Sequence, residues 1–302
     1  MATRLSAEAR RRQTLKERLI EALLFLAAAS SVLVTLGIVG VLVYESAQFF
    51  THVSVFEFLT GTVWTPLFAN PQYGILPLLS GTLLSTLVAL AVAAPLGLIA
   101  AIYLSEFASP RVRETVKPAL EMLSGVPTVV YGYFALLFVT PLLQRIIPGL
   151  PGFNILSAGV VIGIMIIPYV SSLSEDAMRA VPMSLREGSL GLGATRLETA
   201  FRVVLPAAFS GVAAAFVLGI SRAVGETMVV AIAAGQQPNL TFDPTEPAAT
   251  ITAYIVQVAL GDLPHGSIGY QTIFAAGLTL LVITLLFNIL AFWLRQKFRE
   301  AY

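Results

Sequence analysis

The chain has 302 residues, of which 57% are hydrophobic and 12% are charged, and its formal net charge is +1. A soluble domain of this size is usually about a quarter charged, so the composition excludes a large soluble core and predicts a membrane protein with several spans. There are no cysteines and only two histidines, which excludes disulfides and thiolate metal sites. We expect no metal site, no cofactor and no nucleic-acid partner.

Six apolar runs of about 20 residues with few charges mark candidate transmembrane helices. They cover Ala22–Tyr44, Leu76–Leu104, Ala119–Leu143, Ile155–Leu173, Ala207–Ala234 and Tyr270–Leu294. Prolines in these runs are compatible with membrane helices, because neighbouring helices and hydroxyl groups can satisfy the freed carbonyls. The expected fold is all-α, a polytopic membrane protein with six transmembrane helices.

Lysine and arginine are concentrated on one side of these six alternating spans. They occur in the N-terminal tail (Arg4 to Arg18), the second-to-third connection (Arg111, Arg113, Lys117), the fourth-to-fifth connection (Arg179, Arg186, Arg196, Arg202) and the C-terminus (Arg295, Lys297, Arg299). The opposite side carries Arg145 alone. The positive-inside rule therefore predicts that both termini are cytoplasmic.

The N-terminal region combines a basic tail, residues 1–21, with the first apolar run. This run is longer than the roughly 7–15 residues of a signal-peptide core, so we expect a retained span. The tail is expected either to lie along the inner membrane surface as a basic helix, or to remain in water, where its positive charge determines the orientation of the first span. Residues 22–75 would form the first transmembrane helix and an outer loop, and residues 76–302 the membrane core.

Three motifs of hydrolytic enzymes are absent from the chain. It contains no G-x-x-x-x-G-K-[ST], no H-E-x-x-H and no G-x-S-x-G. We therefore expect no catalytic residues. Uphill transport by such a chain would depend on an ion gradient or on a partner subunit.

The connection between the fourth and fifth spans is long, charged and compatible with helix formation. Its prolines and glycines predict a first helix from about Pro182 or Ser184 to Gly191–Gly193. A second helix is predicted from about Thr195 to Val204, because Thr195 and Glu198 have the spacing of a capping box. A short helix across the cytoplasmic face of a bundle suits binding by another protein, although a solvated connection fits the residues equally well.

This connection resembles the signature of ABC-importer permeases, which reads E-A-A, three residues, G, nine residues, I-x-L-P. The matching residues are Glu187, Gly188 and Ser189 for E-A-A, then Gly193, then Val203 to Pro206 with Leu205 and Pro206 at the closing positions. Gly188 and Ser189 replace the alanines, and glycine should weaken a helix by about 1 kcal/mol relative to alanine. The resemblance implies that residues 187–193, including Leu190, form a coupling helix seated in a groove of an ATPase subunit.

From about Tyr73 to the C-terminus the chain resembles phosphate permeases of the PstC type. The matching segments are "YGILPLLSGTL" (73–83), "PLGLIAAIYLSEF" (95–107), "LSGVPTVVYG" (123–132) and "SRAVGETMVV" (221–230). The resemblance implies an ATP-driven phosphate importer in the inner membrane of a bacterium, with residues 76–302 as its permease core. The implied partners are the bilayer, a PstB-like ATP-binding subunit, a PstA-like sister permease and a PstS-like phosphate-binding protein. Permeases for molybdate and sulfate share the coupling loop, so another oxyanion stays open.

Two charged residues, Arg222 and Glu226, lie inside the fifth apolar run. The run contains ten Leu, Ile, Phe or Val residues. Each contributes about −0.3 to −0.6 kcal/mol to the free energy of membrane insertion. A central arginine costs about +2.5 to +3.5 kcal/mol, and an acidic residue a similar amount. Both side chains must therefore face a polar interior. Their i,i+4 spacing places both on one helix face, about 6 Å apart along the axis.

That spacing predicts either a salt bridge that holds the bundle together or a translocation site. The PstC resemblance implies the second, in which Arg222 binds the oxyanion and Glu226 holds the guanidinium when the site is empty. An ion-coupled secondary carrier, with the same two residues as substrate and proton sites, is an alternative that leaves the coupling loop unexplained.

Other polar side chains are candidates for the same path. They are Thr227 beside Glu226, and Ser124, Thr128 and Tyr131 from the third span. Packing of small and hydroxyl residues between helices is an equally good interpretation of the last three.

The outer loops are acidic, with Glu45, Glu57, Asp243, Glu246 and Asp262 against Arg145. Such a face repels free phosphate, which fits delivery by a separate binding protein. The segment "ATITAYIVQVAL" (249–260) is expected either to form an interfacial helix at that docking surface or to cap the bundle.

Overall fold

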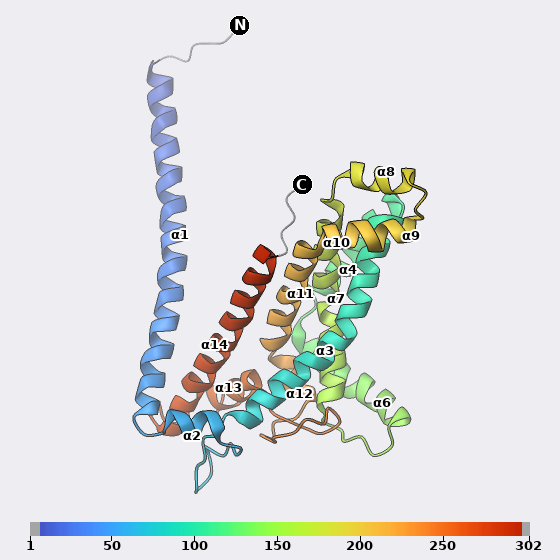
Figure 1. Ribbon diagram of the computed structural model, residues 1–302. Helices are drawn as coiled ribbons and strands as arrows, with labels where there is room; N and C mark the ends of the chain where they lie inside the picture. The colour runs from blue at the N-terminus through green and yellow to red at the C-terminus, as the bar shows by residue number, and fades with distance from the viewer. Residues whose placement is uncertain (1–6, 298–302) are drawn as a thin grey trace.

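The computed structural model describes residues 7–297, which form a bundle of helices (Figure 1). Five of these helices are long and apolar enough to cross a membrane, and a bent pair, Arg196–Ala207 with Phe209–Val224, makes a sixth candidate. Within the described residues the β pairing is limited to one bridge between Trp64 and Tyr73. The predicted all-α, polytopic fold is confirmed, with the bent pair at the fifth span.

The helices in chain order are α1 (Ala7–Phe50), α2 (Val55–Thr60), α3 (Leu76–Ile102), α4 (Pro110–Leu123), α5 (Thr128–Phe134), α6 (Thr140–Ile146), α7 (Ile155–Arg179), α8 (Met183–Gly191), α9 (Arg196–Thr199), α10 (Leu205–Ala207), α11 (Phe209–Val224), α12 (Met228–Ala233), α13 (Ile251–Ala259) and α14 (Ile268–Lys297). Three π-helical turns continue or join them. Tyr103–Phe107 extends α3, Ala135–Val139 joins α5 to α6, and Ala200–Val204 joins α9 to α10.

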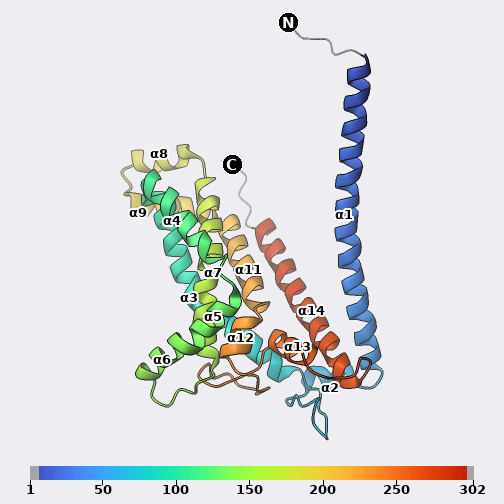
Figure 2. The same ribbon diagram turned by 180° about the vertical axis from the view of Figure 1, so that it is seen from behind.

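Helix α1 is a single helix of 44 residues that stands beside the bundle and packs against α14 (Figures 1 and 2). At 1.5 Å per residue it extends about 66 Å, roughly twice the ~30 Å hydrocarbon core of a bilayer. From Ala7 onward the basic tail therefore continues the axis of the first span and does not turn to lie along a surface. Arg4 lies outside the described residues.

The centre of the bundle is the packing of α3 against α7, which depends on glycine. A Cβ atom added at Gly159 or Gly163 would stand 2.6 or 2.7 Å from the Cβ of Val88 or Val92 on α3. These contacts are shorter than real Cβ contacts, so the two backbones approach more closely than larger residues would permit. Helix α11 packs against the same α7.

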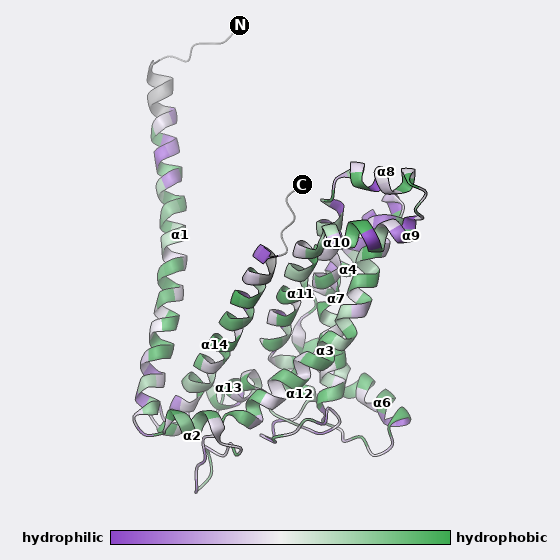
Figure 3. Cartoon of the chain, in the orientation of Figure 1, coloured by the Kyte–Doolittle hydropathy of each residue, from purple (hydrophilic) through white to green (hydrophobic). Residues whose placement is uncertain are grey.

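Helices α8 and α9 lie at one end of the bundle, on the side where α1 begins and α14 ends (Figure 1). Hydrophilic residues are frequent in α8 and α9 (Figure 3). Residues Arg113, Arg179, Arg186 and Arg196 all line one cavity there. This arrangement matches the distribution on which the positive-inside prediction rests. We call this end the basic end, and the other the outer end.

The outer end is closed by α2, α13 and a set of aromatic side chains in edge-to-face contact. Phe49, Phe58, Trp64 and Tyr254 form a chain with ring centroids 5.1 to 6.1 Å apart. Helix α13 buries Ile251 to Tyr254 and Val258, and packs against α14 and α3. Of the two interpretations of residues 249–260, the structure favours the one in which the segment caps the bundle.

The third predicted span was placed too early in the chain. The residues from Ala119 to Leu123 belong to α4, a separate helix with no buried side chain. The chain then breaks at residues 124–127, and the membrane candidate runs from Thr128 to Ile146. The break has a local cause, because Pro127 lies in an extended conformation directly before α5 and disfavours a helical residue ahead of it.

The fifth predicted span, Ala207–Ala234, is not one helix. Helix α11 ends at Val224, Gly225 follows as its C-cap, and α12 begins only at Met228. At the other end of α11, the segment before Phe209 is bent away by 75°. The break after Val224 separates the two charged residues of this run and changes what each can do.

Candidate functional site: a coupling face and a mid-bundle arginine

The predicted coupling helix is α8, Met183–Gly191, and its end is defined by Gly193. The Gly193 N–H donates to the Leu190 carbonyl (3.0 Å), and the Ala194 N–H donates to the Ser189 carbonyl (3.2 Å). Gly193 has φ +90°. This is the Schellman arrangement, in which the residue after the C-cap adopts a left-handed conformation that favours glycine. The glycine of the coupling signature therefore has a structural explanation.

Helix α8 presents its signature residues to the outside. Glu187, Gly188 and Leu190 are exposed, and Ser189 is half-buried with its hydroxyl 2.9 Å from that of Thr199. Just beyond the helix, Leu192 is 92% exposed. A single exposed leucine is ordinary on a protein surface, but its place at the tip of α8 leaves it accessible to any protein that binds this helix. Sequence reasoning missed Leu192, although its position between two glycines marks it as a projecting residue.

The second predicted helix of this connection is also present. Glu198 accepts a hydrogen bond from the Thr195 N–H (2.9 Å), and Thr195 Oγ1 accepts one from the Glu198 N–H (3.2 Å). The predicted capping box is therefore confirmed. At the end of the signature, Leu205 packs in a cluster of apolar residues and Pro206 is exposed.

Arg186 attaches α8 to the bundle, a role that the sequence did not reveal. Its guanidinium donates to both carboxylate oxygens of Glu106, with N–O distances of 3.1 and 3.0 Å. It also donates to the carbonyls of Val181 (2.6 Å) and Met178 (2.8 Å). Glu106 lies in the π-helical turn that extends α3. One side chain thus joins α8 to the ends of both α3 and α7.

A second ion-pair cluster joins α4 to α7 and was likewise missed. Glu175 is 1% exposed and accepts a hydrogen bond from Lys117 (2.6 Å), which also binds Asp176. Burial lowers the pKa of Lys117, but the hydrogen bonds to Asp176 and Glu175 outweigh that effect and raise it. A buried carboxylate needs such partners, because an uncompensated charge in the interior is very costly.

Arg222 lies near the middle of the bundle, in the last turn of α11. Its guanidinium carbon is 5.8 Å from the centre of the Tyr169 ring on α7. Tyr169 is about 21 Å along the helix axis from Ile155 and about 15 Å from Arg179. The Arg222 side chain is exposed on the isolated chain, and within residues 7–297 it has no ion pair. An arginine at this depth costs about 2.5–3.5 kcal/mol when lipid surrounds it, so its face must line water or another subunit.

Glu226 does not pair with Arg222, and the prediction that the two share one helix face was wrong. Glu226 is 5% exposed. Its Oε1 accepts hydrogen bonds from the N–H groups of Met228 (3.1 Å) and Val229 (3.3 Å), the first residues of α12. Its backbone carbonyl accepts one from the Thr252 hydroxyl (2.6 Å). Glu226 therefore satisfies backbone groups that the helix break sets free.

Three of the four remaining candidates for the path make local hydrogen bonds, and Thr128 does not. Thr227 donates to the Gly225 carbonyl (3.3 Å) at the break. Ser124 is the C-cap of α4 and bonds to the Glu121 carbonyl (2.6 Å), so it lies before the third span and not within it. Tyr131 is buried and donates to the Leu123 carbonyl (2.8 Å). Thr128, half-buried at the start of α5, makes no side-chain hydrogen bond within the described residues.

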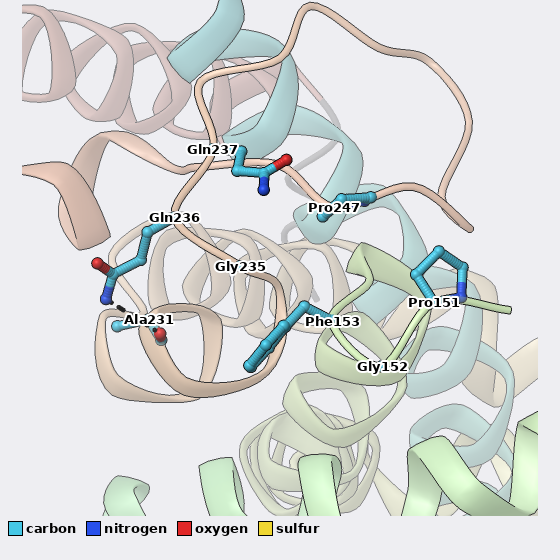
Figure 4. Close-up of a pocket in the computed structure, with 8 residues that line it drawn as sticks. All are labelled: Pro151, Gly152, Phe153, Ala231, Gly235, Gln236, Gln237 and Pro247. Carbon is cyan, nitrogen blue, oxygen red and sulfur yellow. Dashed lines mark hydrogen bonds between the residues drawn. The ribbon is translucent and has the colours of Figure 1, made fainter.

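The outer end carries a cavity of about 550 Å³ without charged lining residues (Figure 4). Its walls come from the loop before α7, which includes Phe153, and from α12 with the loop that follows it. The Gln236 side-chain amide donates to the Ala231 carbonyl (3.4 Å). Nearby, hydrogen bonds from the Thr245 hydroxyl and N–H hold the pKa of Asp243 below its ordinary value.

Residues 7–297 contain no group of three His, Asp or Glu side chains arranged to hold a metal ion.

The comparisons with known proteins agree on one family. Residues 93–300 match the family described as the inner membrane component of binding-protein-dependent transport systems. A probable ABC transporter permease protein, YqgH of Bacillus subtilis, is 36% identical over 276 residues, covering 91% of this chain and 88% of that protein. The phosphate transport system permease protein PstC of Mesorhizobium japonicum is 33% identical over 293 residues, covering 90% and 88%.

Solved structures support the same fold. A bacterial ABC transporter that imports the acidic polysaccharide alginate has a TM-score of 0.64 at 18% identity, covering 95% of this chain and 100% of that chain. The MetNI methionine ABC transporter in an inward-facing conformation has a TM-score of 0.55 at 18% identity, covering 75% and 95%. At these identities the likeness concerns the fold alone. Together with the family match, it identifies the chain as a member of the binding-protein-dependent transport system inner membrane component family.

Proposed function

We propose that this chain forms one half of the translocation path of an ATP-driven importer of inorganic phosphate. The observation that carries the proposal is the position of Arg222 at mid-depth in a transport permease, where its guanidinium has no ion-pair partner among residues 7–297. Arginine presents a planar set of donors that matches the oxygens of a tetrahedral oxyanion. Several relatives at about 33% identity are named as PstC phosphate permeases, which supports phosphate as the substrate.

The energy source in this proposal is a separate PstB-like ATP-binding subunit, which binds α8. Support comes from the exposed signature residues Glu187 and Leu190 and from the projecting Leu192. A PstA-like sister permease would cover the face that exposes Arg222. A PstS-like binding protein would deliver phosphate to the outer end, where its own site, and not the acidic surface, would attract the anion. The basic end and both termini then lie in the cytoplasm of a bacterium.

The revised role of Glu226 changes the mechanism expected from the sequence. In the part of the chain that the structure describes, Arg222 has no carboxylate to release when substrate arrives, and its contact is the Tyr169 ring. Phosphate therefore replaces a cation–π contact and water, instead of breaking a salt bridge. The hydroxyl of Thr128 makes no hydrogen bond within the described residues, so Thr128 is the remaining candidate whose side chain could contact a substrate on the path.

A competition experiment separates phosphate from other oxyanions. The complex reconstituted with its partner subunits in liposomes should take up labelled phosphate, and excess molybdate or sulfate should leave that uptake nearly unchanged. If molybdate or sulfate competes more strongly than unlabelled phosphate, the chain is a permease for that oxyanion instead. Both outcomes leave the family assignment intact.

A further inference from the structure

A cavity of about 470 Å³ lies at the basic end, between the coupling helix and the bundle. It is bounded by the end of α3, the start of α4, the end of α7, and helices α8 and α9. Its charged lining residues are Arg113, Arg179, Arg186, Arg196 and Glu106. Four arginines against one glutamate give the lining a formal charge of +3.

The arginines differ in how far their donors are already used. Arg186 is committed to Glu106 and to two carbonyls. Arg113 and Arg179 both approach Oε1 of Glu175, but at 3.9 and 3.7 Å, which exceeds hydrogen-bond distance. That oxygen has no hydrogen-bond partner in the described structure. Both arginines line the cavity, and within the described residues neither guanidinium group makes a hydrogen bond.

Arg196 adds a third available guanidinium from the opposite wall. It lies at the start of α9 and makes no ion pair with any residue from 7 to 297. Even when the buried Glu175 is counted beside the cavity, the local charge is +2. Arg113 and Arg179 have only long ion pairs, which they share on Glu175. The three guanidinium groups around one partly enclosed space repel one another, and an anion between them relieves that repulsion.

We propose that this cavity binds an oxyanion of phosphate type on the cytoplasmic side of the membrane. A phosphate group has the size and the oxygen geometry to take paired hydrogen bonds from Arg113, Arg179 and Arg196. The group belongs either to free inorganic phosphate or to the headgroup of an anionic phospholipid. The inference rests on the charge and geometry of the basic end, and it stands whether or not phosphate is the transported substrate.

An anion bound in this cavity would affect the coupling helix. The three arginines come from α4, α7 and α9, and the cavity wall between them includes Met183 and Leu190 of α8. An anion that ties these elements together restrains the motion of α8 relative to the bundle. Bound anion should therefore slow ATP-driven turnover.

The test measures inorganic phosphate binding to the purified full chain by isothermal titration calorimetry at constant ionic strength. Arg222→Ala is present in every sample, so that a site on the translocation path does not contribute. Arg179→Gln and Arg196→Gln should each weaken binding by about tenfold or more, because each removes charge-assisted hydrogen bonds. The matched controls Arg111→Gln and Arg202→Gln remove the same charge from exposed positions outside the cavity and should change affinity less than about twofold.

A second experiment, in lipid nanodiscs, distinguishes the two sources of the phosphate group. The same proteins are placed in nanodiscs of phosphatidylcholine alone or with phosphatidylglycerol. If a headgroup occupies the cavity, phosphatidylglycerol raises the thermal unfolding midpoint of the parent chain but not of Arg179→Gln or Arg196→Gln. If free phosphate is the ligand, the calorimetric result stands and the lipid has no selective effect. Absence of both effects, or equal losses in the control variants, would overturn the proposal. Failure of phosphate uptake by the assembled complex would instead count against the proposed function.

Discussion

Arg186 of α8 and Glu106 of the π-helical turn that extends α3 form a two-point ion pair across 80 residues of sequence, with N–O distances of 3.1 and 3.0 Å. Both side chains are largely buried, at 12% and 10% exposure. The same guanidinium donates to the carbonyl of Met178 in the last turn of α7 and to that of Val181 just after it. A displacement of α8 by an ATPase subunit would therefore pull directly on the two helices that form the centre of the bundle.

Replacing Arg186 tests this connection. Arg186→Gln should lower the free energy of unfolding by roughly 3 kcal/mol, because it leaves the Glu106 carboxylate buried without its partner. In the reconstituted complex it should abolish the stimulation of ATP hydrolysis by loaded binding protein. Glu106→Gln with Arg186→Gln, which removes both charges, should recover part of the stability but not the coupling. Normal stimulation in Arg186→Gln would show that force does not pass through this pair.

Gly188 and Gly193 should respond in opposite directions to alanine. A Cβ at Gly188 meets nothing within 4 Å, so Gly188→Ala should stabilise α8 by about 1 kcal/mol, or slow its amide exchange about fivefold. Gly193 has φ +90°, so Gly193→Ala should destabilise the helix end by about 1 kcal/mol or more. Hydrogen exchange of the α8 amides measures both. Equal effects of the two substitutions would contradict the assigned helix end.

Leu192 should be a contact for the ATP-binding subunit. Leu192→Asp should leave the stability of the chain within about 0.5 kcal/mol, since the side chain is 92% exposed. It should weaken association with the ATP-binding subunit by tenfold or more, because it puts a charge where an apolar group is buried. The control is Leu240→Asp, a partly exposed position in the loop after α12. Unchanged association of Leu192→Asp would exclude the tip of α8 from the interface.

Local signals in the sequence predicted the coupling region well. Capping of α9 by Thr195 and Glu198, and the end of α8 at Gly193, depend on residues within one helical turn. The tie between Arg186 and Glu106 depends on tertiary packing, which residue spacing does not encode. The same holds for the cluster around Glu175.

The errors in the membrane region have a different cause. Hydropathy averaged over about 20 residues does not register a break of three residues. It therefore predicts one helix where α11 ends at Val224 and α12 begins at Met228. Gly225 was the available signal, because glycine often marks a helix end. The misplaced third span has the same origin, since apolar residues at the end of α4 were joined to α5 across Pro127.

The role of Glu226 as a helix cap can be separated from a role as a charge partner. Glu226→Ala should lower the free energy of unfolding by about 1–2 kcal/mol, because it frees the N–H groups of Met228 and Val229. Glu226→Gln, whose amide oxygen can still accept those hydrogen bonds, should retain most of the stability. Denaturant titration of the two variants provides the measurement. If the two variants lose the same stability, the charge and not the cap would be what matters.

Uptake of labelled phosphate into proteoliposomes tests the central claim most directly. The chain alone should show neither uptake nor ATP hydrolysis. Addition of the ATP-binding subunit, the sister permease and the binding protein should produce ATP-dependent uptake. Arg222→Ala should reduce that uptake to background while the complex still assembles, and Arg145→Ala, at the outer end, should transport normally. Phosphate flux through the chain alone, or undiminished uptake by Arg222→Ala, would contradict the account.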